Sequence, residues 1–329
     1  MSSLLTERPD VAAETATGNA PRARTRAADL DGILAADRPR DLPAAETTAG
    51  GRRGSPVVRR LLRDPKFWIA SPLLAAFVML AMVPGFFTRV EPVDCRLARS
   101  LGSPQAGHPF GFDLLGCDYL SRTVYGARSS LTIAVMVVIL AMAVAVALGA
   151  LAGLAGGAVD VVISRAADVV FGVPVVLGGL VILALQEDRG MVQVALVLAA
   201  LSWPAMLRLM RIAVISQLQT SYVEAARALG ASRWRILRRH VLTAAIGPVL
   251  VYATALIGAI VAAEATLSFM GVGLQLPAIS WGLQLAAAQT HIGQAPHLLI
   301  PGGFVMLAVL GFVLAGDAVR DALDPRGEA

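Results

Sequence analysis

The most regular feature of the sequence is a series of long uncharged runs separated by polar segments. The runs cover 67–87, 129–159, 169–186, 190–207, 241–263 and 298–316. Each has 18 or more residues, close to the ~20 that cross a ~30 Å hydrocarbon core as an α-helix. The runs are continuously apolar and lack the alternation of barrel strands. The pattern therefore predicts an all-α polytopic membrane protein with six transmembrane helices.

Composition supports a bilayer as the surroundings of the chain. The 329 residues are 56% hydrophobic and the mean hydropathy is +0.68, values that soluble domains rarely reach. The segment 1–56 differs, because it has no apolar periodicity and balances eight arginines with eight acidic residues. It is predicted to be a disordered cytoplasmic tail. Its near-neutral charge argues against a nucleic-acid partner.

The distribution of arginine predicts how the spans are oriented. Arginines are concentrated in the 208–240 loop and just before the first run, whereas 265–297 has neither Lys nor Arg. By the positive-inside rule, both termini and the 208–240 loop are cytoplasmic in a multi-pass protein of the plasma or inner membrane. The segment 88–128 carries five arginines on the expected outer side, but its length weakens their effect.

The boundaries of the uncharged runs, together with this orientation, predict the organisation of the whole chain. The uncharged stretch 265–290 is expected to be an extracytoplasmic or re-entrant segment with Trp281 among its aromatic interface anchors. The expected parts are a tail at 1–56, an interfacial helix and first span at 57–87, an extracytoplasmic segment at 88–128, a five-helix core at 129–318 with a cytoplasmic loop at 208–245, and a cytoplasmic tail at 319–329.

Two features within the spans bear on packing and transport. Gly149, Gly153 and Gly157 repeat at intervals of four, a spacing that lets helix backbones approach closely in lipid. Packing within the six-helix bundle is favoured over a dimer interface. Glu264 ends the fifth run, where a carboxylate is costly unless it faces water or a partner. It either lines a translocation path or lies at the interface at a helix end.

Several kinds of chemistry are absent from the sequence. The single lysine, Lys66, precedes Phe67, so the Gly-Lys-Ser/Thr of a P-loop does not occur. The four histidines lack metal-binding spacing, and no Gly-x-Ser-x-Gly elbow occurs. The chain is expected to be non-catalytic and to bind no metal or cofactor of its own.

The 208–240 loop is longer than a turn requires and has the pattern of a helix–turn–helix. Gly230 is expected to end a first helix, and Ser232 to cap a second one that carries Trp234. Glu224 is alone among arginines, where it can cap the helix or pair with a base. One reading is an interfacial helix held by anionic lipid, and another is a docking element.

The loop residues also carry a family resemblance. Glu224-Ala225-Ala226 and Gly230, followed by His240, Leu242 and Thr243, resemble the EAA motif of binding-protein-dependent ABC importer permeases. His240 replaces an aliphatic residue and Thr243 replaces proline. The segments 108–128, 264–271 and 316–326 are similar to signatures of the C-type permease subunit of dipeptide and oligopeptide importers. The resemblance covers roughly 67–326.

The resemblance implies a type I ABC importer permease fold and several partners. These are a homologous second permease, two ATPase subunits that bind ATP and Mg, and an extracytoplasmic substrate-binding protein. Dipeptides and oligopeptides are the leading substrates, with nickel chelates and glutathione as alternatives. The expected ATPase-coupling residues are Glu224, Ala225, Ala226, Arg227, Gly230 and Trp234.

Two other functions stay open from the residues alone. An ion-coupled secondary transporter could use Glu264 and Asp168 as ion sites, although inverted repeats and paired carboxylates are not evident. A membrane scaffold or receptor could use the basic loop for docking. Neighbouring genes for an ATPase and a secreted binding protein would favour the importer.

The two cysteines lie on the same predicted outer segment. The family pattern often has arginine where this chain has Cys117, and Cys95 faces the same oxidising side. A Cys95–Cys117 disulfide is predicted, closing a loop of about 20 residues and contributing ~3 kcal/mol in the chain-entropy model. The alternative is two unrelated free thiols.

Overall fold

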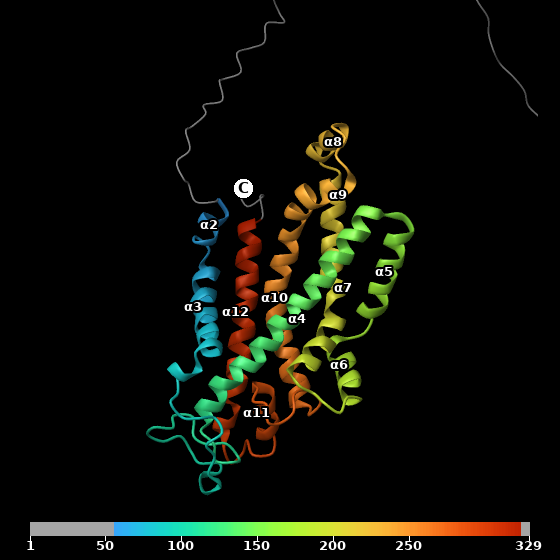
Figure 1. The fold of residues 1–329 in the computed structure, drawn as a ribbon. Helices are drawn as coiled ribbons and strands as arrows, with labels where there is room; N and C mark the ends of the chain where they lie inside the picture. The colour runs from blue at the N-terminus through green and yellow to red at the C-terminus, as the bar shows by residue number, and fades with distance from the viewer. Residues whose placement is uncertain (1–55, 324–329) are drawn as a thin grey trace, which may run out of the picture. The chain divides into compact units, whose positions relative to one another are not determined.

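The computed structural model of the protein describes residues 56–323 (Figure 1). The tail predicted over 1–56 lies outside them except for Pro56, and the tail over 319–329 is described only as far as Leu323. Regular structure in the described part is helical throughout, and only isolated β-bridges occur beside it. The all-α fold expected from the sequence is therefore confirmed.

Five helices in the described part are long and apolar enough to cross a membrane. They are α3 (Pro65–Met82), α4 (Tyr119–Ala155), α7 (Met191–Leu218), α10 (Leu242–Phe269) and α12 (Ile300–Leu323). The pair α5 (Gly157–Phe171) and α6 (Val175–Ala184) adds a sixth span if it is taken as one crossing with a bend of 79°. This agrees with the six spans that the apolar runs predict.

The third span is where pattern and structure differ most. The apolar run begins at 169, but α5 begins at Gly157, because Asp160 and Asp168 lie within a helix whose charges are paired with α7. The helix then breaks before Pro174, which is the N-cap residue of α6. Proline lacks an N–H and disfavours the α-region for the residue before it, so the break falls here. The hydropathy pattern therefore missed the first part of α5, because its aspartates interrupt the apolar run and their pairing with arginines cannot be seen in the sequence.

The centre of the bundle is formed by α4, α7 and α10. A Cβ atom built on Gly149 would lie 2.8 Å from Met210 Cβ, and one on Gly153 would lie 2.8 Å from Val214 Cγ1. These glycines therefore allow α4 to approach α7 within one chain. The prediction that the small residues pack inside the bundle is confirmed for Gly149 and Gly153.

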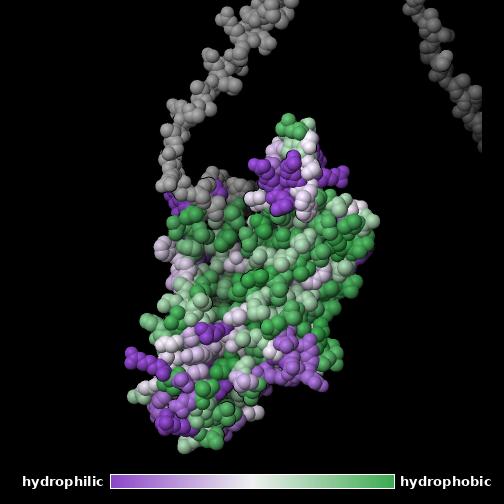
Figure 2. All heavy atoms as spheres, viewed as in Figure 1, coloured by the Kyte–Doolittle hydropathy of each residue, from purple (hydrophilic) through white to green (hydrophobic). Residues whose placement is uncertain are grey.

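The bundle has two ends, which we call the α8 end and the α11 end. At the α8 end lie α2 (Pro56–Leu61), α8 (Ser221–Ala228) and the last turn of α12 (Figure 1). Lys66 Nζ and Asp321 Oδ2, 2.9 Å apart, join α3 to α12 there. At the α11 end lie the segment 83–118 and α11 (Trp281–Ala288). Figure 2 shows an apolar band between these two more polar ends, as expected for helices that face lipid.

Trp281 was expected to anchor a segment at the membrane interface, and this is wrong. Its side chain is wholly buried, and its ring packs edge-on against Phe77 at 5.7 Å between centroids. Its Nε1 donates a hydrogen bond to the Thr123 carbonyl at 2.9 Å. The indole N–H thus finds its partner inside the bundle rather than at a polar headgroup. It ties α11 to the first turns of α4.

Candidate coupling site and buried polar network

The chain leaves α7 and forms a pair of short helices that projects beyond the bundle (Figure 1). We call this pair, α8 (Ser221–Ala228) and α9 (Arg233–Ile236), the coupling hairpin. Gly230 lies between them with φ of +79°, a conformation that favours glycine. The Ala231 N–H donates to the Ala226 carbonyl at 3.1 Å, which closes the end of α8. The predicted helix–turn–helix is confirmed.

One side of the coupling hairpin is fixed to the bundle. Val223 and Ile236 of the hairpin are buried in the main apolar core, as is Leu237 directly after it. The Tyr222 hydroxyl donates to Gln217 Oε1 at 2.7 Å, and its ring centroid lies 6.2 Å from that of His240. His240, a departure from the motif, lies in the π-helical turn η3 (Leu237–Val241) that leads into α10, and its ring therefore packs beside α8.

The other side of the hairpin is open to a partner. Glu224, Ala225 and Arg227 are exposed, whereas Ala226 is half-buried. Trp234 is 58% exposed. Within the described residues, Glu224 has no ion pair or side-chain hydrogen bond, so the pairing with an arginine across the turn does not form there.

The exposed side combines charge with apolar surface. Leu229, at the tip, is 89% exposed. Figure 2 shows apolar and hydrophilic surface side by side over this projection. Exposed aromatic and aliphatic side chains rimmed by charge are typical of a protein-docking surface. The geometry suits a partner protein that covers Trp234 and Leu229 and supplies a cation for Glu224.

Glu264 lies in a buried polar network rather than at a helix end. α10 continues past it to Phe269, and its side chain is wholly buried. Ser130 Oγ donates to Glu264 Oε2 at 2.9 Å, and Ser268 Oγ donates to Oε1 at 2.8 Å. The helix therefore does not end at Glu264, and its carboxylate faces neither lipid nor headgroups. The carboxylate instead joins α10 to α4.

Two cavities lie along the same helix without reaching Glu264. A cavity of about 320 Å³ lies beside the bend between α5 and α6, with Pro174, Pro204 and Tyr252 in its lining. A second one, of about 630 Å³, is lined by residues that include Tyr252, Asp317 and Arg320. Glu264 lines neither of them. Its expected place on a translocation path stays a prediction.

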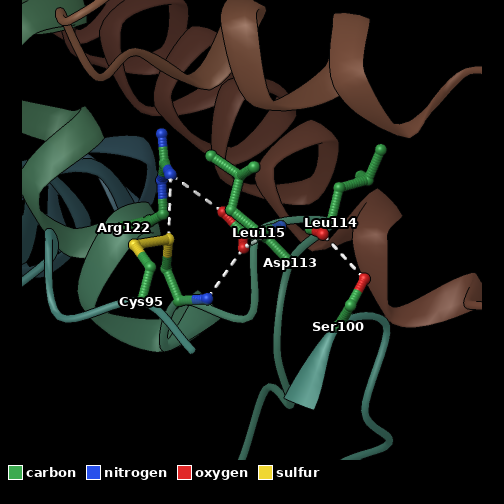
Figure 3. Close-up of a disulfide and its surroundings, with 7 residues drawn as sticks. Cys95, Ser100, Asp113, Leu114, Leu115 and Arg122 are labelled. Atoms are coloured by element: carbon green, nitrogen blue, oxygen red, sulfur yellow. Dashed lines mark hydrogen bonds and ion pairs between the residues drawn. A yellow bond between two sulfur atoms is a disulfide. The ribbon is translucent and has the colours of Figure 1, made fainter. Parts of the chain in front are cut away.

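The cysteines lie at the α11 end, where their sulfur atoms are joined in a disulfide (Figure 3). Asp113 fixes the surrounding loop, because its Oδ1 accepts the Cys117 N–H at 2.8 Å and the Leu115 N–H at 2.9 Å. Its Oδ2 pairs with Arg122 Nη1 at 2.9 Å. The disulfide closes a loop within the segment before α4, and the ion pair attaches this segment to the first turn of that helix.

Two ion pairs between α5 and α7 were not anticipated from the sequence. Asp160 pairs with Arg211, and Asp168 pairs with Arg208. A signal was present, because the two acidic residues precede the third apolar run and the two arginines directly follow the fourth, so they can meet if the two spans are antiparallel. Among the described residues, no group of three or more His, Cys, Asp and Glu is placed to hold a metal ion.

Comparison with known proteins agrees with this architecture. Residues 145–328 match the family described as the binding-protein-dependent transport system inner membrane component. The chain is 38% identical to the glutathione transport system permease protein GsiD of Pectobacterium atrosepticum, over 76% of this chain and 85% of that protein. It is 35% identical to the dipeptide transport system permease protein DppC of Alkalihalophilus pseudofirmus, over 77% and 84%. It is 32% identical to the probable D,D-dipeptide transport system permease protein DdpC of Escherichia coli, over 81% and 90%. The protein is thus a member of the family of binding-protein-dependent transport system inner membrane components, the membrane-spanning and non-catalytic subunits of ABC transporters.

Proposed function

We propose that this protein is one of two permease subunits of an ATP-driven importer of dipeptides and oligopeptides. Two ATPase subunits, which bind ATP and Mg, dock at the α8 end. An extracytoplasmic binding protein delivers peptide to the α11 end, and the peptide crosses between the two permeases. Both termini and the coupling hairpin are cytoplasmic in this arrangement, in keeping with the arginines of the 208–240 loop.

The observation that carries the proposal is the coupling hairpin. Its apolar side is buried in the bundle, while Glu224 and Trp234 are exposed. The chain has a single lysine, Lys66, and hence no P-loop, so the ATP that drives the proposed importer has to be bound and hydrolysed by another subunit. A rigid element that is fixed to the spans and open on its other side is suited to receive that motion.

The substrate class is drawn from the relatives. Two of them are named as dipeptide or D,D-dipeptide permeases, and one as a glutathione permease. Glutathione is therefore the second candidate substrate, favoured by the relative with 38% identity. Both kinds of substrate are small and carry charged termini and amide groups, so one permease architecture can serve either.

The test is reconstitution of the whole complex in proteoliposomes. ATP hydrolysis and uptake are measured with a radiolabelled dipeptide, a tetrapeptide and glutathione, each with the binding protein. Glu224→Lys is compared with Glu187→Lys, which changes an exposed glutamate in the loop before α7. Gly230→Pro is compared with Gly230→Asn, because asparagine tolerates a positive φ and proline does not.

The expected result is ATP-dependent uptake of peptide by the wild type and by both control variants. Glu224→Lys and Gly230→Pro should insert into the membrane but lose the link between ATP hydrolysis and uptake. Full uptake by Gly230→Pro would refute the coupling role. If the complex imports glutathione but neither the dipeptide nor the tetrapeptide, glutathione is the substrate and the peptide proposal is refuted.

A further inference from the structure

The ion pairs between α5 and α7 differ in how firmly they join the two helices. Arg211 contacts Asp160 with both Nε and Nη2, the latter at 2.6 Å from Oδ2, and Ser164 Oγ donates to the same carboxylate at 3.2 Å. The planar fork of an arginine on a carboxylate fixes orientation as well as distance. Arg208 reaches Asp168 with a single nitrogen at 2.8 Å.

The Asp160–Arg211 pair is also the more buried of the two ion pairs. The side chains of Arg211 and Asp160 are 32% and 17% exposed. Those of Arg208 and Asp168 are 43% and 48% exposed, and an exposed pair contributes little. The Asp160–Arg211 pair, near the start of α5, is therefore the firmer of the two ion pairs between α5 and α7.

Arg211 lies on the part of α7 that leads directly to the coupling hairpin. It precedes the end of α7 at Leu218 by about two helical turns, and α8 begins at Ser221. This stretch of α7 is packed closely against α4, because a Cβ atom built on Gly153 would lie 3.1 Å from the Arg211 carbonyl oxygen. Only Gln219 and Thr220 separate α7 from α8, so Arg211 and the coupling hairpin lie on adjoining elements of the chain.

The other end of α5 lies beside the smaller cavity. Phe171, Val173 and Pro174, at the 79° bend, line the cavity of about 320 Å³ together with residues from α7 and α10. The helix is interrupted here, so α5 and α6 are separate helical segments. A displacement of α5 would move Phe171, which lines this cavity.

We propose that the Asp160–Arg211 pair positions α5 during coupling, so that a displacement of the coupling hairpin reaches the bend at 172–174 and the cavity beside it. This rests on the proposed function, since it needs an ATPase that moves α8. Both residues are positioning residues, because they act on the pathway only through α5.

The test uses the reconstituted complex and measures the number of peptides imported per ATP hydrolysed. Asp160→Asn and Arg211→Gln should each lower this ratio, on the order of fivefold or more, while the permease still assembles with its partners. The double variant Asp160→Arg with Arg211→Asp restores opposite charges and should recover most of the ratio. Asp321→Asn, which breaks the exposed pair with Lys66, is the matched control and should leave the ratio unchanged.

The ratio separates a positioning role from a purely structural one. A variant that only folds poorly loses uptake and ATP hydrolysis in parallel, and an unchanged ratio in Asp160→Asn overturns the inference. Failure of the charge-swapped variant to regain the ratio overturns it as well. If the wild-type complex shows no ATP-dependent uptake, the proposed function and this inference both fail. If the wild type imports peptide and Glu224→Lys is uncoupled, but Asp160→Asn behaves as wild type, only this inference fails and the proposed function stands.

Discussion

Replacing Glu264 tests whether the buried carboxylate holds the bundle together. Ser130 from α4 and Ser268 from α10 both donate to it, and each also accepts a backbone N–H, from Trp281 at 3.4 Å and from Leu274 at 3.1 Å. One side chain thus organises α4, α10 and the segment that leads into α11. Glu264→Ala removes the acceptor for both hydroxyls at once.

The cost of Glu264→Ala follows from these contacts. A buried hydroxyl that loses its partner costs about 1–3 kcal/mol, and the lower value applies because each serine can turn toward a helix carbonyl. Two hydroxyls then cost about 2 kcal/mol, and the cavity left by the side chain adds about 2 kcal/mol. The sum of about 4 kcal/mol corresponds to a fall of on the order of 10 °C in Tm.

The assay is thermal unfolding of the purified permease in detergent, followed by the fluorescence of its tryptophans. Trp281 makes the signal sensitive to this region, because its backbone N–H contacts Ser130 and its ring is buried. Glu264→Gln is the matched control, since it keeps the volume and one acceptor oxygen, and it should cost about 1 kcal/mol. An Ala variant with the Tm of the wild type would show that the network does not stabilise the fold.

Two further predictions concern packing and the disulfide. Gly153→Leu should destabilise the bundle by about 1–3 kcal/mol, because a side chain there meets Val214 at once. Gly247→Ala, with nothing within 4 Å of the new Cβ, should be neutral or stabilise by up to ~1 kcal/mol, and thermal unfolding compares the two. Replacing Cys95 and Cys117 by serine opens a loop with a sequence separation of 22 and should lower stability by about 3 kcal/mol in non-reducing denaturation. Mass spectrometry of non-reduced wild-type peptides that found both thiols free would contradict the disulfide.

The sequence by itself determined the parts of this protein that depend on local pattern. Runs of 18 or more uncharged residues predict spans because the bilayer admits helices and excludes charge. Gly230 and Ser232 predict the turn of the coupling hairpin because a left-handed residue ends one helix and a hydroxyl caps the next. Both signals lie within a few residues of the structure that they specify.

Tertiary structure alone decided the features that depend on partners distant in the chain. Asp160 lies within α5 because Arg211 on α7 pairs with its charge. A hydropathy pattern along the sequence does not show which distant residue neutralises a charge. Glu264 and Trp281 are placed by Ser130 and Thr123 on α4, more than 130 residues away. Burying a charge or an indole N–H costs free energy unless a polar partner lies within hydrogen-bonding distance. The position of that partner is fixed by the packing of whole helices and not by the neighbouring residues in the sequence.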